Sequence, residues 1–299
     1  MLVLGVDMGG SATRWVACRA TDGSVVARGQ TTGATGLLFS DAARAAFHDA
    51  LAPIPASLPA PLTAACLGVT GAGIDRDPAV VAAVGAALGL PGDRVTVMND
   101  VVLAWHTAFP GGQGHLVAAG TGSVGISIDA TGAITLVGGR GSLIDDGGSG
   151  AWIALTALDA LFRRIDETGH PDGAEGLAHH LWQAVGGAGW DPVRRHVYGL
   201  DRGAIGTLAP AVAAAAHQGD AIALGVMTQA GRELARLARV LVARCGPAPV
   251  AVVGGVLALH PAIRAAMETA VPAIPLHFPV IDAAAHAAAM ARTATGAPA

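Results

Sequence analysis

The fold is decided by residues 3–16, which read Val3-Leu4-Gly5-Val6-Asp7-Met8-Gly9-Gly10-Ser11-Ala12-Thr13-Arg14-Trp15-Val16. Residues 116–128 repeat the pattern as Leu116-Val117-Ala118-Ala119-Gly120-Thr121-Gly122-Ser123-Val124-Gly125-Ile126-Ser127-Ile128. Each stretch is a β-rich run, a turn rich in glycine and hydroxyl residues, and a second β-rich run, which predicts a β-hairpin. Such a tip presents open backbone N–H groups, which suit phosphate oxygens. The repetition predicts two related lobes that hold one polyphosphate from opposite sides.

The composition indicates a folded protein with about two domains. The chain has 299 residues, of which 52% are hydrophobic and 13% are charged, and its net charge is −4. The apolar content excludes a disordered chain, and the slight acidity gives no basic surface for nucleic acid. All 18 basic residues are arginine. A P-loop needs a lysine, so any phosphate binding here depends on backbone N–H groups, a metal ion and arginine.

Cysteine and histidine positions offer no metal centre or disulfide framework. Cys18, Cys66 and Cys245 are scattered in or beside apolar runs, and no histidine falls at a ligand spacing. Polar residues interrupt the alanine-rich stretches at helical spacing, which predicts helices in water and no membrane partner. Met1 leads directly into a first strand without a charged leader, so we expect a cytoplasmic protein.

The predicted order of elements is that of an α/β protein with mixed sheets. Strands are expected at 2–6, 13–19, 24–30, 63–69, 94–98, 115–120, 123–129, 132–137 and 249–253. Helices are expected at 37–52, 77–89, 100–108, 149–166, 174–186, 203–217, 219–245, 260–270 and 283–293. Residues 52–62 form a proline-rich connector, and residues 109–114 mark the boundary between lobes. We expect one lobe over 1–110, completed by the C-terminal helix 283–299, and a second over 111–282 with a helical insertion.

Two aspartates end predicted strands in the first half. Asp7 precedes the first glycine turn, where its carboxylate could hold Mg²⁺ over phosphates or simply stabilise the turn. Asp100 follows Asn99 between a strand and a helix. An N-cap is one explanation for this pair, and a general base at the carboxyl edge of the sheet is the other.

Two further glycine-rich segments lie in the second half. Residues 138–152 carry Arg140, Asp145 and Asp146 among glycines and run into a helix at about Ser149. Those charges favour a ligand loop over a flexible connector. Gly254-Gly255 follows a buried strand, which is a weak nucleoside signal because such turns also occur for packing reasons.

Together these segments resemble the sugar kinase/Hsp70/actin superfamily over essentially the whole chain. Within it the chain resembles the branch of N-acetylglucosamine kinases, glucosamine kinases and BadF/BadG-type ATPases. The family loop D-G-G-G-T is similar to Asp7-Met8-Gly9-Gly10-Ser11, and A-G-T-G-S matches Ala119-Gly120-Thr121-Gly122-Ser123. The resemblance implies an α/β fold of two RNase H-like, actin-like ATPase lobes with a nucleotide cleft between them.

A third loop separates the subfamilies. N-acetylglucosamine kinases resemble G-G-W-G…G-D-E-G-S, whereas this chain has Arg140 at the tryptophan position and Gly147 where glutamate stands. The glucosamine kinase pattern G-G-R…D-x-G-S-G-A matches residues 138–140 and 146–151. Thr35 stands where the family has a sugar-binding asparagine, so one amide group is lost.

The resemblance implies a kinase that uses ATP and Mg²⁺ to phosphorylate an amino sugar at its 6-hydroxyl. Glucosamine is the first candidate for that sugar. The alternatives are an N-acetylglucosamine kinase and a nucleotide-binding sensor or ATPase without sugar chemistry. Asp100 would be the base and Asp7 the metal ligand. Nucleotide contacts would come from Gly9, Gly10, Ser11, Thr13, Gly120, Thr121, Gly122, Gly254 and Gly255. Sugar contacts would come from Thr35, Thr70, Asp100, Gly139, Arg140 and Asp146. A homodimer is also implied.

Overall fold

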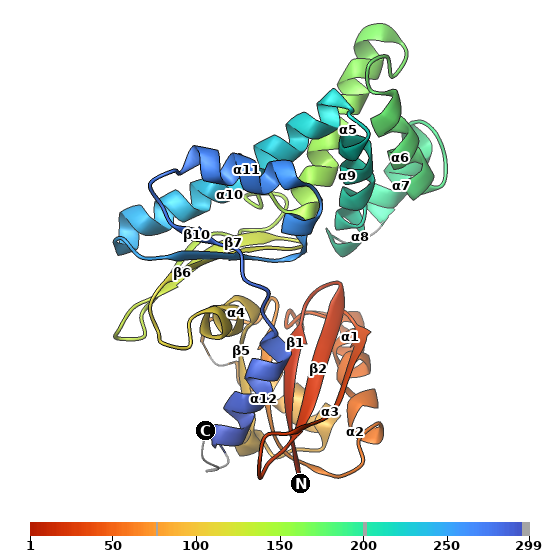
Figure 1. Cartoon of the computed structure of the whole chain (residues 1–299). Coiled ribbons are helices and arrows are strands. Elements are labelled where there is room, and N and C mark those ends of the chain that lie inside the picture. The colour runs from red at the N-terminus through yellow and green to blue at the C-terminus, as the bar shows by residue number, and fades with distance from the viewer. Residues whose placement is uncertain (76, 200–201, 295–299) are drawn as a thin grey trace. The chain divides into compact units, whose positions relative to one another are not determined.

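The computed structural model describes residues 1–75, 77–199 and 202–294, and the chain divides into two compact units (Figure 1). Unit 1 comprises Met1–Pro110 and Val280–Ala299, and unit 2 comprises Gly111–Pro279. The last helix, α12 (Ala283–Ala294), therefore belongs with the N-terminal part of the chain. The final residues of the predicted helix 283–299, from 295 onward, lie outside the described residues.

Unit 1 contains a five-stranded mixed sheet in the order β3-β2-β1-β4-β5. The antiparallel meander consists of β1 (Leu2–Met8), β2 (Ala12–Arg19) and β3 (Val25–Thr32). On the other side of β1, β4 (Leu62–Val69) and β5 (Val95–Asn99) run parallel to it. Its helices are α1 (Asp41–Leu51), α2 (Pro53–Ala56), α3 (Pro78–Leu88), α4 (Asp100–Ala108) and α12, with a short 3₁₀ helix η1 (Gly92–Arg94).

Helices cover both faces of this sheet, which explains why β1 is apolar without alternation. Leu4 and Val6 lie in one core with residues of α1 and α3, and Val3 lies in another with α4 and α12. The close approach of α12 to β1 requires Gly5, because a Cβ there would lie 2.1 Å from the carbonyl oxygen of Ala284. In Figure 1 the blue α12 accordingly runs beside the red strands from the other end of the chain.

Unit 2 has the same sheet plan, in the order β10-β9-β6-β7-β8. Its meander consists of β6 (His115–Ala119), β7 (Ser123–Ile128) and β8 (Ile134–Gly138), and β9 (Val250–Val253) and β10 (Leu276–His277) continue in parallel. The helices of unit 2 are α5 (Gly150–Thr168), α6 (Glu175–Val185), α7 (Trp190–Gly199), α8 (Arg202–Gly206), α9 (Ala209–His217), α10 (Ala221–Cys245) and α11 (Pro261–Ala270), with a 3₁₀ helix η2 (Gly255–Ala258). The two sheets therefore support the repetition seen in the sequence.

Every strand predicted from the sequence is present, to within about two residues. Three local predictions differ, and the helix α7 and the strand β10 were not predicted at all. The helix predicted over 37–52 begins at Asp41, because the Ser40 side chain caps it by accepting a hydrogen bond from the backbone N–H of Ala43 at 3.1 Å. The proline-rich connector contains α2, whose first residue is a proline, the position where the missing N–H costs least. The helix predicted over 203–217 divides into α8 and α9.

Candidate active site

Three parallel strands of unit 1 end together at one edge of the sheet. The register aligns Met8 at the end of β1 with Val69 of β4, and Val69 with Asn99 of β5. Thr70 and Asp100 follow directly after these strands. Carboxyl ends of parallel strands are where ligands bind in α/β sheets. Two predicted site residues are therefore brought together although 30 positions separate them in the chain.

Asn99, and not Asp100, is the N-cap of α4. Its side-chain oxygen accepts a hydrogen bond from the N–H of Val101 at 3.0 Å, and its amide nitrogen donates to the carbonyl of Ala72 at 2.6 Å. Asp100 is the first residue of the helix, and its Oδ1 accepts from the same N–H of Val101 at 2.9 Å. The capping explanation thus applies first to the asparagine, which leaves the aspartate available for chemistry.

Removal of the Asp100 carboxyl from water raises its pKa to about 6. A hydrogen bond from the Thr70 side chain opposes this rise, the negative charge of Asp7 adds to it, and the hydrogen bond from the N–H of Val101 lowers the pKa again. A carboxyl group with a pKa near neutrality can accept a proton and release it at physiological pH. Asp100 therefore has the properties of a general base.

Thr70 links three parts of this edge. Its backbone N–H donates to the carbonyl of Met8 at 2.9 Å, and its own carbonyl accepts from the N–H of Gly36 at 2.8 Å. Its side chain bonds to Asp100. Thr35, in the same loop as Gly36, is partly buried, and its hydroxyl accepts from the N–H of Leu37 at 3.4 Å. The loop of residues 33–36 is thereby held at the edge that carries Asp100.

The tip of the first hairpin is residues 9–11, closed by a 2.9 Å bond from the N–H of Gly9 to the carbonyl of Ala12. The 33–36 loop packs on it so closely that a Cβ on Gly33 would lie 2.3 Å from the carbonyl oxygen of Gly10. A Cβ on Gly10 itself would meet no described atom within 4 Å. The tip is therefore open on one side, as a phosphate-binding turn requires.

Thr13 is the second residue of the return strand β2 and is fully buried. Within the described residues its hydroxyl has no hydrogen-bond partner. Leaving a buried hydroxyl unpaired costs about 1–3 kcal/mol, so such groups usually mark a special position. An orphaned hydroxyl beside an open glycine turn fits a strand that handles a polar ligand.

Asp7 offers the carboxylate expected for a magnesium ion. Its side chain is 28% exposed, and its Oδ2 lies 3.9 Å from Nη1 of Arg14. Burial raises the pKa of Asp7, Arg14 lowers it and Asp282 raises it. No three acidic, histidine or cysteine side chains form a complete metal cage anywhere in the described chain. One or two carboxylates completed by phosphate and water are nevertheless what Mg²⁺ prefers, so this donor set fits that ion.

The second hairpin tip, residues 120–122, is built into the start of α5. A bond from the N–H of Gly120 to the carbonyl of Gly122 closes the turn at 2.9 Å. The carbonyl of Gly120 then accepts from the N–H of Gly150 at 2.9 Å, and that of Thr121 accepts from the N–H of Ala151 at 3.4 Å. The first turn of the helix therefore fixes the position of the predicted phosphate loop.

The predicted sugar loop is joined to the same hairpin. Asp146 is 4% exposed, and its Oδ1 accepts a hydrogen bond from the N–H of Ser123 at 3.4 Å. The hydroxyl of Ser123 donates to the carbonyl of Gly147 at 2.7 Å. A Cβ on Gly122 would lie 3.2 Å from Asp146 Oδ1, so this glycine admits the carboxylate. The structure thus places the predicted phosphate-binding and sugar-binding segments of unit 2 in direct contact.

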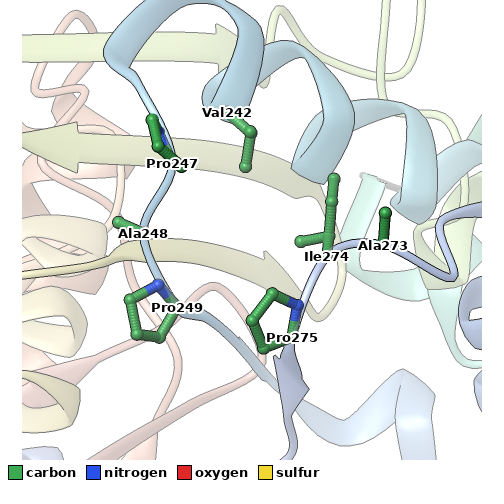
Figure 2. A pocket seen from close by; sticks show the side chains of 7 residues that line it. All are labelled: Val242, Pro247, Ala248, Pro249, Ala273, Ile274 and Pro275. Carbon is green, nitrogen blue, oxygen red and sulfur yellow. The ribbon is translucent and has the colours of Figure 1, made fainter.

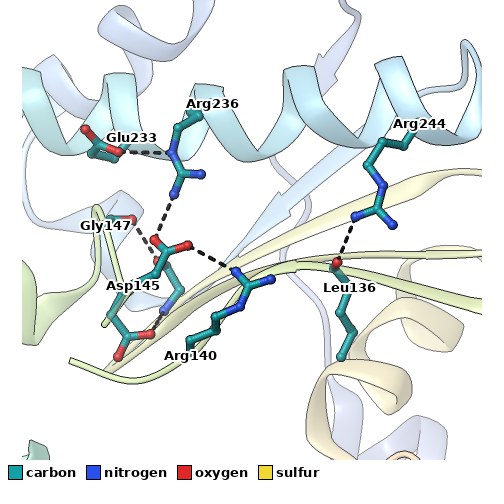
Figure 3. A network of polar contacts seen from close by, with 9 residues as sticks. Leu136, Arg140, Asp145, Gly147, Glu233, Arg236 and Arg244 are labelled. Carbon is teal, nitrogen blue, oxygen red and sulfur yellow. Dashed lines mark hydrogen bonds and ion pairs between the residues drawn. The ribbon is translucent and has the colours of Figure 1, made fainter. Parts of the chain in front are cut away.

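Figure 3 shows a charged network around the neighbouring Asp145 that the sequence analysis did not assign. Arg236 of α10 donates from Nη2 to Asp145 Oδ1 at 2.8 Å and from Nε to Glu233 Oε2 at 3.2 Å. Arg140 donates from Nη1 to Asp145 Oδ2 at 3.5 Å. In the sequence Glu233 and Arg236 are simply polar residues on an alanine-rich helix, and only the fold brings them to the loop.

The two glycines that follow β9, Gly254 and Gly255, differ in their surroundings. Gly254 has φ of +116°, and a Cβ on it would lie 2.1 Å from the carbonyl oxygen of Ala119. This residue is therefore glycine for packing against the end of β6. A Cβ on Gly255 would meet no described atom within 4 Å, which leaves Gly255 as the better nucleoside contact of the two. Gly139 also has a positive φ, of 70°, where the loop leaves β8.

An apolar pocket of about 270 Å³ lies elsewhere in unit 2 (Figure 2). Its lining side chains are Val242, Pro247, Ala248, Pro249, Ala273, Ile274 and Pro275. None of these is a predicted site residue, and none can titrate, so this pocket is not the candidate active site. In the part of the chain that the structure describes, no helix is both long and apolar enough to cross a membrane.

Comparisons with known proteins identify the family of the chain and proteins of similar fold. Residues 4–287 match the BadF/BadG/BcrA/BcrD ATPase family. A curated relative, the N-acetylmuramic acid/N-acetylglucosamine kinase of Clostridium acetobutylicum, is 27% identical over 174 residues. That match covers 58% of this chain and 56% of the relative, so the chain spans little more than half of that protein's length.

Solved structures are similar over nearly the whole chain. A protein from Chromobacterium violaceum, described as a candidate N-acetylglucosamine kinase, is 27% identical with a TM-score of 0.75 and coverage of 97% of this chain and 98% of that one. A second candidate N-acetylglucosamine kinase, from Porphyromonas gingivalis, is 18% identical with a TM-score of 0.77 and coverage of 97% and 99%. A glucokinase of the ROK family from Streptomyces griseus is 19% identical with a TM-score of 0.60 and coverage of 99% and 100%. The last two show the fold alone, and the predicted fold class is confirmed.

Proposed function

Because this chain belongs to the BadF/BadG/BcrA/BcrD ATPase family, we propose that it is an ATP-dependent kinase that phosphorylates an amino sugar. The observation that carries the proposal is Asp100, a partly buried carboxyl group at the carboxyl edge of the unit 1 sheet with a pKa of about 6. A sensor that only binds a nucleotide has no need for such a base. The kinases among the relatives support the same reaction class.

In this proposal Asp100 accepts the proton of the sugar 6-hydroxyl as that oxygen attacks the γ-phosphorus of ATP. The new bond joins the sugar oxygen to phosphorus, and the bond from phosphorus to the departing ADP oxygen breaks. Asp7 would hold Mg²⁺, which would supply positive charge to the phosphates. Positioning and charge stabilisation then account for most of the rate.

Backbone groups hold the phosphates, since the chain has no lysine to do so. In unit 1 the open tip at Gly9, Gly10 and Ser11 serves this purpose, with Thr13 behind it. In unit 2 the corresponding tip is Gly120 to Gly122, with Gly255 at the nucleoside. The open space over Gly10 and Gly120, where a Cβ would meet no described atom within 4 Å, supports this assignment.

Glucosamine is the first candidate for the sugar. Its amine is a cation near neutral pH, and the predicted sugar loop carries the carboxylate of Asp146, whereas Asp145 and Glu233 are already paired with Arg236. Residues 138–140 and 146–151 also match the glucosamine kinase pattern. N-acetylglucosamine is the second candidate, because the names of the relatives point to acetylated sugars.

The deciding experiment measures ADP release from Mg²⁺-ATP with glucosamine, N-acetylglucosamine, N-acetylmannosamine and glucose. We expect strong stimulation by glucosamine, and phosphorus NMR of the product would locate the phosphate on the 6-hydroxyl. Preference for an acetylated sugar would replace glucosamine with the second candidate. ATP hydrolysis that no sugar stimulates would contradict the kinase assignment and favour an ATPase or a nucleotide sensor.

A further inference from the structure

We propose that Arg236 is the positioning residue for the loop of residues 138–148, and that it sets the affinity for the sugar without contacting it. The kinetic part of this inference rests on the proposed function. The structural part does not, because it concerns only the contacts between α10 and the loop.

The tip of the loop makes too little apolar contact to hold the loop in place. Leu143 and Ile144 are 97% and 76% exposed, so they bury almost no apolar surface that could anchor the segment. Its internal bonds form one tight turn, in which the N–H groups of Ile144 and Asp145 donate to the carbonyl of Gly141 at 3.0 and 2.9 Å. Such a turn fixes the shape of the loop but not its position against the rest of unit 2.

Arg236 attaches the loop of residues 138–148 to the helix α10. The helix α10 buries Leu234, Leu237 and Leu241 in the main core of unit 2, so the backbone that carries Arg236 is well fixed. From it the guanidinium reaches Asp145, 91 residues away in the chain, with a charge-assisted bond of 2.8 Å. Asp145 also accepts a hydrogen bond from Arg140 through its second carboxylate oxygen. Arg236 therefore restrains Asp145 directly and Arg140 through Asp145.

Glu233 orients the guanidinium. Its Oε2 accepts from Arg236 Nε at 3.2 Å, and its Oε1 accepts from the side-chain amide of Gln229 at 3.1 Å. The glutamate also lies against the loop itself, since a Cβ on Gly147 would be 2.9 Å from Oε2. The glycine at this position therefore makes room for a carboxylate that arrives from α10.

Asp146 lies between two residues whose positions are restrained by hydrogen bonds. Asp145 is held by Arg236, and the carbonyl of Gly147 is held by Ser123. Release of the first restraint would free the segment that leads into Asp146, which would then be held by its own bonds from the N–H groups of Ser123 and Ser149. We therefore expect loss of Arg236 to weaken sugar binding more than it slows turnover or weakens ATP binding.

The structural part is tested by limited proteolysis with trypsin, which cleaves after arginine. Arg140 is exposed in the loop, so cleavage of the Arg140–Gly141 bond reports release of the loop. We expect Arg236→Gln to accelerate that cleavage several-fold, measured by mass spectrometry. Arg239→Gln is the matched control, because Arg239 is an exposed arginine of the same helix. Equal cleavage rates in the two variants, with equal melting temperatures, would overturn the proposal.

The kinetic part compares KM and kcat in the same variants. Arg236→Gln should raise the KM for the sugar by about tenfold, or about 1.4 kcal/mol, because binding must then order the released loop. Arg236→Lys should recover part of this loss because it keeps the charge. A fall in kcat with unchanged KM would contradict a positioning role. If the wild-type protein shows no sugar-stimulated activity, the proposed function fails, and the proteolysis still decides whether Arg236 holds the loop.

A double-mutant cycle checks the route through Asp145. Asp145→Ala should reproduce the effect of Arg236→Gln on cleavage and on the KM for the sugar. The double variant should be no worse than either single variant, because both remove the same bond. Additive effects would show that the two residues act independently, which would also overturn the proposal.

Discussion

The Thr70 side chain donates a hydrogen bond to the carboxylate of Asp100, from the end of the neighbouring parallel strand. This bond stabilises the ionised carboxylate, whereas burial favours the neutral form, and the balance leaves the pKa of Asp100 at about 6. Thr70 was expected to line the sugar pocket. The contact with Asp100 indicates a second role, which is control of the proposed base.

Replacement of Thr70 by valine should move the acid limb of the activity profile to higher pH. Valine keeps the shape of the side chain but removes the donor that lowers the pKa of Asp100. The measurement is kcat/KM between pH 5 and 8 for both proteins. Thr70→Ser keeps a hydroxyl and should restore the wild-type profile. An acid limb that does not move in the valine variant would show that this hydrogen bond does not govern the base.

The wild-type protein should lose the proposed kinase activity as the pH falls through about 6. The proposed base acts in its ionised form, and the ionised fraction of Asp100 declines about tenfold per unit below its pKa. The profile of kcat/KM for the sugar measures this directly. A rate that stays constant down to pH 5 would rule out a base with the pKa of Asp100.

Asp100→Asn should reduce turnover by about 10²–10⁴-fold, the usual contribution of a general base. It should not reduce stability at pH 8. The folded-state pKa of about 6 lies above the unfolded value of 3.8, so ionisation of Asp100 above pH 6 opposes folding, and a neutral side chain relieves that cost. Thermal unfolding at pH 8 should give a melting temperature at or above that of the wild type. Normal turnover in a folded variant would remove Asp100 from the mechanism.

Two alanine variants at the first hairpin tip, Gly10→Ala and Gly33→Ala, should affect ATP binding and folding stability separately. A Cβ on Gly10 meets no described atom within 4 Å, so its unfolding free energy should change by less than about 0.5 kcal/mol while the KM for ATP rises. A Cβ on Gly33 would lie 2.3 Å from the carbonyl oxygen of Gly10, so that variant should lose about 1–3 kcal/mol. Denaturant titration and ATP kinetics measure the two effects. Unchanged ATP kinetics in Gly10→Ala would place the phosphates elsewhere.

Removal of magnesium with EDTA should abolish sugar phosphorylation, and added Mg²⁺ should restore it. Asp7→Asn should raise the Mg²⁺ concentration for half-maximal activity by roughly tenfold or more, because an amide is a weaker ligand than a carboxylate. A titration of activity against Mg²⁺ at saturating ATP makes the comparison. Equal Mg²⁺ requirements in the two proteins would exclude Asp7 as the ligand.

Local patterns were sufficient to predict the strands and most helices. The β-rich runs on both sides of each glycine turn give β1 with β2 and β6 with β7, because alternation and turn chemistry act between residues that are close in the chain. Two less regular segments were not predicted from the sequence. The helix α7 has only ten residues with a proline at its third position, and β10 has only two residues, which are defined by their pairing with β9.

By itself the sequence determined the α/β class, the repeated hairpins, and the placement of Asp7 near the end of β1 and of Asp100 directly after β5. These follow from local conformational preference and from the rule that parallel strands end at one edge. Only the tertiary structure decided that Thr70 bonds to Asp100, that Asp146 lies against Ser123, and that Arg236 holds Asp145. Those contacts join residues 23 to 91 positions apart, and no local preference specifies which distant side chains meet when cores pack.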